Sequence, residues 1–303
     1  MAVQGTSVTT DTLWGRFEST RDHLFNQYTE VRFDPDTGLS LEELENEVSS
    51  YLREHADQSR VLQKANIFRI VLTRGQIAID PEDWFVDKIN HGCPVRSLNS
   101  ERKPHKGGII RRLAVGWLEE AIEGPIAEGA AFLHDAYRRG QAKGPQGGLD
   151  RSHIAPGWDR TLERGLSGLL DDVRSAREAL GSDATSEQLD FYEAVETVYG
   201  ATIELADRFS RLASKMAQEL PEHRERLLAI SSAMSNVPAN RPRNFHEALQ
   251  FMWLMHELIE MEGEFVRSMG QFDRTLYPFF KDDIDSGRLT RDQAKELIQF
   301  FWY

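Results

Sequence analysis

The sequence is poor in cysteine, in basic charge and in long apolar runs, and each shortage excludes a class of protein. Cys93 is the single cysteine among 303 residues, which excludes an internal disulfide and a zinc site built on several cysteines, and fits a reducing compartment. Acidic residues outnumber Lys and Arg by 49 to 36, so the net charge of -13 argues against a general nucleic-acid-binding surface. No apolar run approaches the length of a membrane span, and the first residues lack a signal-peptide pattern. We therefore expect a cytoplasmic protein that binds neither nucleic acid nor a membrane.

Apolar residues at three- and four-residue spacing predict a predominantly α-helical fold with a few strands. Residues 12–57 are expected to form two helices separated by a turn at 33–38, and a third helix is expected over 59–73. The segment 76–89 is expected to be a short extended piece with an acidic turn. The longest predicted helix runs over 186–219 and faces the core.

Glycine marks the middle of the chain. A loop is expected at 91–108, helices at 109–139, and a glycine-dense connection at 138–157. A connection of that length inside a compact domain is more often functional than idle, so it is the first place to look for a site.

Two later helices have unusual composition. The first is expected over 158–180, where Gly165 and Gly168 lower helix stability and therefore suggest close packing. The second is expected to start after an N-cap at Asn244 and to run to 262, with apolar residues around much of its circumference. Such a helix is expected to be buried on more than one side.

The chain ends inside another predicted helix. Thr290 and Gln293 form a capping-box pattern at its start, and the helix then runs into Phe301, Trp302 and Tyr303. We expect these three aromatic residues to form an exposed patch, covered either by a continuation of the chain or by a partner subunit.

One helix carries a near match to a metal-binding motif. His256, Glu257 and Glu260 lack the second histidine that the HExxH pattern of metalloproteases requires. A partly buried helix turn is therefore the favoured interpretation, and no metal ligands are assigned.

Carboxylates accumulate where that helix ends. Glu262 and Glu264 follow the near-motif, in a position that the helix dipole disfavours. Arg267 and Arg274 are near enough in sequence to neutralise them, so a salt-bridged surface and a functional cluster both remain open.

Two candidate sites lie in loops. Cys93 follows His91 and precedes a basic stretch that contains His105, an environment that could lower its pKa, although a lone cysteine is more often inert. His153, just before a predicted helix, could donate a hydrogen bond to a substrate oxygen, and capping or exposure would explain it equally well.

Several spaced blocks resemble the pyruvate formate-lyase-like, or glycyl radical, enzyme family. Residues 191–217 resemble its long helix, and residues 230–256 resemble its VPA turn with the helix that follows. Residues 268–297 resemble the next block, and residues 152–169 are similar to its glycine-histidine element. Weaker similarity reaches back to about Ala65.

The resemblance implies the N-terminal part of the α/β ten-stranded barrel fold of glycyl radical enzymes. Residues 1–303 would then form a partial domain, with N-terminal helices at 1–60 and a family-like region at 61–303. This partial domain would lack the catalytic cysteine loop and the C-terminal glycyl radical domain, and Cys93 does not match the family's cysteine. The family uses a glycyl radical installed by an S-adenosylmethionine iron-sulfur activating enzyme, so no cofactor is expected in this chain itself. The implied partners are a segment or chain carrying the catalytic Cys and Gly and an activating enzyme, and a homodimer remains open.

The resemblance also implies two substrate-binding residues and no catalytic one. In the dehydratase-like branch, which acts on small polyols and related compounds, the positions matching His153 and Ser268 line the substrate site. The chain departs from the family nearby: Gln271 replaces an arginine, and Phe265 and Val266 replace a histidine-serine pair.

Three functions remain open. The first is the N-terminal portion of a glycyl radical lyase or dehydratase that acts on a small polar substrate such as a polyol, an amino alcohol or a 2-oxo acid. The second is a non-catalytic scaffold or regulatory protein that binds a partner through its C-terminal apolar helix. The third, a hydrolase using Cys93 or a metal at His256, depends only on near matches to motifs.

Overall fold

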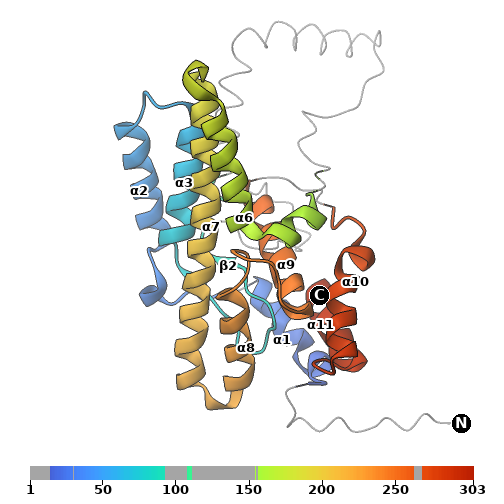
Figure 1. The fold of residues 1–303 in the computed structure, drawn as a ribbon. Coiled ribbons are helices and arrows are strands. Elements are labelled where there is room, and N and C mark those ends of the chain that lie inside the picture. The colour runs from blue at the N-terminus through green and yellow to red at the C-terminus, as the bar shows by residue number, and fades with distance from the viewer. Residues whose placement is uncertain (1–13, 30, 93–107, 111–153, 155, 263–267) are drawn as a thin grey trace, which may run out of the picture.

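The computed structural model describes residues 14–29, 31–92, 108–110, 154, 156–262 and 268–303, and most of these are helical (Figure 1). Their α-helices are α1 (Phe17–Thr29), α2 (Leu41–Glu54), α3 (Arg60–Arg74), α6 (Trp158–Ala179), α7 (Ser186–Glu219), α8 (Arg224–Met234), α9 (Phe245–Glu262), α10 (Phe272–Asp285) and α11 (Arg291–Trp302). The short 3-10 helices are η1 (Pro35–Thr37), η2 (Gly181–Asp183) and η3 (Pro221–His223), and the strands are β1 (Ile77–Ala78) and β2 (Lys88–Ile89). The prediction of a predominantly helical fold with a few strands is confirmed. No helix in this described part is long and apolar enough to cross a bilayer.

The predicted helix starts are present. Thr290 and Gln293 form a capping box at the start of α11, with Thr290 Oγ1 accepting from Gln293 N at 3.2 Å and Gln293 Oε1 accepting from Thr290 N at 2.8 Å. At the start of α9, Asn244 Oδ1 accepts from Glu247 N at 2.9 Å. These contacts satisfy N–H groups that the first helical turn leaves without partners.

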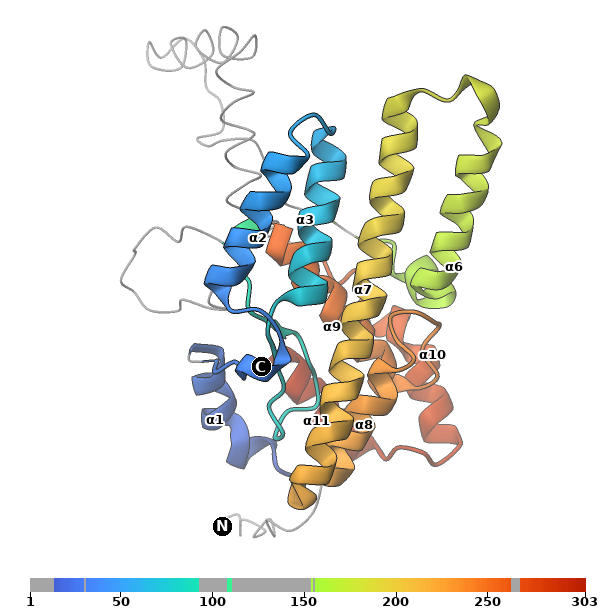
Figure 2. The same cartoon turned by 90° about the vertical axis from the view of Figure 1, so that its left-hand side faces the viewer.

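Helix α7 is the long axis of the fold, and α3, α6 and α8 pack along it (Figures 1 and 2). It spans the predicted range. Leu205 and Phe209 of α7 pack with Val71 of α3 and Leu227 of α8 in one buried apolar cluster. The expectation that α7 faces the core is confirmed.

Helix α9 lies between two apolar clusters. Leu254 and Leu258 belong to the cluster around α7, whereas Phe245 and Leu249 belong to a second cluster that includes Leu297 of α11. This arrangement explains why α9 is apolar around much of its circumference, and it confirms burial on more than one side.

The extended segment predicted at 76–89 is an antiparallel pair of short strands. Ile77 of β1 lies opposite Ile89 of β2. The connection between the strands is fixed from α9, because Gln250 Oε1 accepts from Val86 N and Gln250 Nε2 donates to Val86 O, both at 3.0 Å. Two buried backbone groups are thereby satisfied by one side chain.

The expected patch of three exposed aromatic residues at the end of the chain is wrong for Phe301. Its side chain is 3% exposed and contacts the rings of Phe85 and Trp253. Tyr303 is partly covered by the ring of Phe17 from α1, whereas Trp302 is 58% exposed. Other described segments therefore cover these residues: Phe85, α9 and Phe272 of α10 cover Phe301, and α1 covers part of Tyr303.

Candidate functional site

Helix α6 bends sharply at Gly165. This residue has φ +62°, and the two N–H groups that follow it donate outside the helix, Leu166 N to Pro238 O at 2.8 Å and Ser167 N to Ala239 O at 2.9 Å. A Cβ atom at Gly165 would lie 2.5 Å from Ala239 O, which confirms the predicted close packing at this glycine. The loop at 237–240 therefore holds the bend.

The predicted close packing is wrong for Gly168. The nearest atoms to a Cβ at this position belong to the side chain of Arg164, one turn earlier in the same helix. The nearest neighbour of Gly168 is therefore its own helix, whereas that of Gly165 is the loop at 237–240.

Ser268 lies beside the start of α6. Its N–H donates to Ile154 O at 2.8 Å, and its carbonyl oxygen accepts from Trp158 Nε1 at 2.9 Å. The exposed Ser268 hydroxyl accepts from Gly270 N at 3.0 Å, which leaves its own hydrogen available to an external acceptor. Two sequence blocks more than a hundred residues apart therefore meet at Ile154 and Ser268. His153, the other predicted substrate-binding residue, lies outside the described residues.

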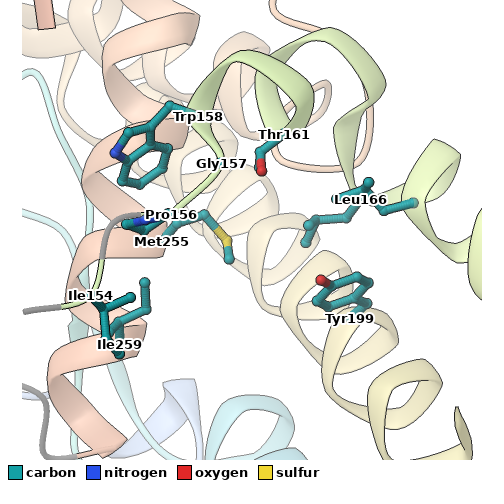
Figure 3. A pocket seen from close by; sticks show the side chains of 10 residues that line it. Ile154, Pro156, Gly157, Trp158, Thr161, Leu166, Tyr199, Met255 and Ile259 are labelled. Atoms are coloured by element: carbon teal, nitrogen blue, oxygen red, sulfur yellow. The ribbon is translucent and has the colours of Figure 1, made fainter. Parts of the chain in front are cut away.

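An apolar cavity of about 260 Å³ opens next to this junction, between α6, α7 and α9 (Figure 3). We call it the α6 cavity. Its walls include Ile154, Trp158, Leu166, Met255 and Ile259. Figure 3 shows side chains from all three helices turned toward one space, with two hydroxyl groups, those of Thr161 and Tyr199, among them.

Sequence reasoning missed the α6 cavity and its two hydroxyl groups. Two signals pointed toward it: the glycine-dense connection at 138–157, whose residues Ile154, Pro156 and Gly157 line the cavity, and Gly165, which interrupts an apolar helical stripe. Nothing in the sequence indicated that Tyr199, on another helix, would face the same space.

His91 is buried, and its Nδ1 atom has no hydrogen-bond partner within the described structure. Its ring packs against the backbone of Gly108, where a Cβ atom would lie only 2.2 Å from Nδ1. Burial lowers the pKa of His91 to about 4, so the imidazole is neutral at pH 7. Cys93 and His105, the other members of the predicted thiol site, lie outside the described residues.

Acid is expected to destabilise the protein through His91. Because its folded-state pKa of about 4 lies below the ordinary 6.5, its contribution to stability is complete above pH 6.5 and is lost as the pH falls toward 4. The advantage of the wild type over His91→Gln in free energy of unfolding should shrink by about 3 kcal/mol over that window, measured by urea unfolding at each pH.

Asp83 provides the opposing control. Burial raises its pKa to about 6 against the attraction of Lys88, so its ionisation removes stability as the pH rises from about 4 to 6. Asp83→Asn should therefore steepen the loss of stability on acidification, whereas His91→Gln should flatten it. If the free energy of unfolding changed with pH in the same way in both variants, the shifted pKa values assigned to His91 and Asp83 would be contradicted.

The near match to a metal-binding motif occupies a helix turn. His256, Glu257 and Glu260 are half-buried on α9, as expected, and the ring of His256 stacks on Trp253 with centroids 6.3 Å apart. Within the described residues, no three His, Cys, Asp or Glu side chains are grouped as metal ligands.

The expectation that Arg267 and Arg274 neutralise the glutamates at the end of α9 is corrected for Glu262. Glu262 forms an ion pair with Lys64 of α3, which lies far away in the sequence. Arg274 donates to Gln271 Oε1 at 3.1 Å, and Arg267 and Glu264 lie outside the described residues. The sequence could not predict the pairing with Lys64, because it depends on how α3 packs beside the end of α9.

Comparison with known proteins gives a consistent result. A family model described as pyruvate formate lyase-like matches residues 117–303. Isethionate sulfite-lyase of Oleidesulfovibrio alaskensis is 31% identical over 152 residues, which cover 48% of this chain and 18% of that relative.

Solved structures show the same fold. A glycyl radical enzyme from Archaeoglobus fulgidus matches 91% of this chain with a TM-score of 0.67 and 23% identity. Hydroxyproline dehydratase from Clostridioides difficile matches 97% of it with a TM-score of 0.70 and 21% identity. The chain covers 39% and 40% of these two structures, so it spans well under half their length.

Proposed function

Because the chain belongs to the pyruvate formate lyase-like family, we propose that it forms the N-terminal portion of a glycyl radical lyase or dehydratase and supplies part of the substrate pocket. The observation that carries this proposal is the junction of Ile154 and Ser268, because it joins two of the sequence blocks that carry the family resemblance. The proposal treats residues 1–303 as a partial domain whose family-like region begins near residue 61. It assigns the thiyl cysteine and the radical glycine to a further segment or a partner chain.

The proposed role of Ser268 and His153 is to bind and orient a small polar substrate such as a polyol, an amino alcohol or a 2-oxo acid. The Ser268 hydroxyl accepts from Gly270 N and so can donate to a substrate oxygen. The thiyl cysteine would supply hydrogen abstraction from the substrate, with the hydrogen atom passing to its sulfur, and the glycine would store the radical. Fixed hydrogen bonds to the neighbouring oxygen would then hold the reacting carbon in place. Installation of the radical is proposed to require an S-adenosylmethionine iron-sulfur activating enzyme.

The second function, a scaffold that binds a partner through the C-terminal helix, has less support. Among Phe300, Phe301, Trp302 and Tyr303, Trp302 alone has an exposed side chain. An interface built on α11 would therefore depend on one aromatic residue instead of a patch.

The proposal predicts that Ser268→Ala lowers product formation by about 100-fold, because one donor to the reacting oxygen is lost. The chain would be combined anaerobically with a protein carrying the remaining family segments and with an activating enzyme, and supplied with isethionate and trans-4-hydroxy-L-proline. Product is measured by mass spectrometry, and radical content is measured by electron paramagnetic resonance.

Ser182→Ala is the matched control, because Ser182 is exposed on η2, away from the Ser268 junction. We expect equal radical content in both serine variants and a loss of product only in Ser268→Ala, with a similar loss in His153→Ala. Equal product formation by the Ser268 and Ser182 variants would remove Ser268 from the substrate pocket. Failure of every combination to form a radical would contradict the function itself.

A further inference from the structure

The bend of α6 creates the α6 cavity and keeps its shape. Leu166, which follows the bend, is fully buried and held by its N–H bond to Pro238 O. Trp158, at the other end of the short first half of α6, is 3% exposed and held through Nε1 by Ser268 O. Because both wall residues are fixed by backbone contacts from other segments, the cavity is preformed and does not depend on a ligand to open it.

The size of the cavity suits a compact molecule. A volume of about 260 Å³ exceeds the roughly 150 Å³ of an engineered apolar cavity that binds benzene. It is smaller than the ~300–1,000 Å³ typical of sites for drug-sized ligands. One aromatic ring with substituents, or two fused rings, would fill it.

The lining is apolar except at two places. No charged side chain is among the described residues that line the cavity. Thr161 on α6 and Tyr199 on α7 contribute hydroxyl groups, and Figure 3 shows both oxygens turned toward the space between Met255 and Leu166. Neither side chain makes a hydrogen bond to another described residue. Burial raises the pKa of Tyr199, so its hydroxyl stays protonated and can donate at neutral pH.

We propose that the α6 cavity is a binding site for a compact, planar apolar molecule that carries one hydroxyl or carbonyl group. The apolar walls bind the ring, and the hydroxyls of Thr161 and Tyr199 bind its polar group. A polyol does not fit this site, because several of its hydroxyls would lose water without gaining a partner. The site goes beyond the proposed radical enzyme function, and the two differ in ligand chemistry.

Phenol, benzene and glycerol test the proposal on the purified chain by ligand-observed NMR and isothermal titration. We expect phenol to bind with a dissociation constant of about 0.1–1 mM, given its few non-hydrogen atoms. Benzene should bind about fivefold more weakly, because it lacks the hydrogen bond. Glycerol should not bind.

Variants locate the site. Thr161→Val with Tyr199→Phe removes both hydroxyls with little change in volume and should abolish the preference for phenol while benzene still binds. Tyr277→Phe is the matched control, since Tyr277 is 56% exposed on α10 and does not line the cavity, and it should leave the preference unchanged. Leu169→Trp places a larger side chain in the wall and should weaken phenol binding more than tenfold.

Absence of phenol binding to the wild type at 10 mM would overturn the proposal. An unchanged preference for phenol over benzene in the double variant Thr161→Val with Tyr199→Phe would also overturn it. This double variant still tests the proposal if Leu169→Trp does not fold. The experiment uses no radical, no partner and no activating enzyme, so its failure would leave the proposed enzyme function untouched.

Discussion

Replacing Gly165 by alanine is expected to lower the free energy of unfolding by about 4 kcal/mol. Two causes act together. The backbone of Gly165 has φ +62°, where a side chain is strained, and the added Cβ would lie 2.5 Å from Ala239 O. The obstacle is a backbone carbonyl held by the N–H of Ser167, so it cannot move aside without losing that bond. Urea unfolding followed by circular dichroism measures the change.

Gly200 on α7 provides the opposite case. It is an exposed helical glycine, and a Cβ atom there would meet no atom within 4 Å. Gly200→Ala should stabilise the protein by about 0.5–1 kcal/mol, because alanine has the higher helix propensity. If Gly165→Ala lowered the free energy of unfolding no more than Gly200→Ala does, the described bend of α6 at Gly165 would be contradicted. The described shape of the α6 cavity would then be contradicted as well.

Replacing Arg208 by methionine is expected to destabilise the protein by about 3–5 kcal/mol. Its guanidinium group on α7 donates to Leu72 O near the end of α3, to Gly75 O at 2.6 Å and to Thr37 O at 2.8 Å. Methionine retains most of the apolar contact but leaves three carbonyl groups without this donor. The expected result is a lower urea midpoint with an unchanged slope.

Arg211, one turn further along α7, is the matched control. It is exposed and pairs with Asp207 at 3.1 Å on the same helix, an arrangement that contributes about 0.3–0.5 kcal/mol. Arg211→Met should therefore change stability by less than about 0.5 kcal/mol. A comparable loss in both variants would show that charge on α7, and not the three hydrogen bonds to Arg208, stabilises this junction.

Local patterns predicted the regular elements well. The N-cap of α9, the capping box of α11 and the apolar spacings of α7, α9 and α11 involve residues within one or two turns of each other, so their energetics are contained in short segments of sequence. The spaced blocks of family resemblance also predicted the fold class, because the order of the blocks and their residue types can be read directly from the linear sequence.

The candidate site was less predictable. Ser268 was identified through the resemblance, but its bonds to Ile154 and Trp158 join parts of the chain that no local pattern connects. The expected exposure of Phe301 is wrong for the same reason, since its cover comes from Phe85, from Trp253 of α9 and from Phe272 of α10. Exposure depends on which segments pack together, and periodicity within one helix does not show its neighbours.

The sequence by itself determined the ranges of helices such as α3, α6, α7 and α9, the start of α11, the apolar faces of α7 and α9, and the family to which the chain belongs. Only the tertiary structure decided the meeting of Ile154 with Ser268, the pairing of Lys64 with Glu262, the three bonds of Arg208 and the cavity under the bend of α6. The physical reason is the range of the interactions. Helix propensity and capping act between residues a few positions apart, whereas burial, ion pairing and cavity shape arise between atoms that come together only when the chain folds.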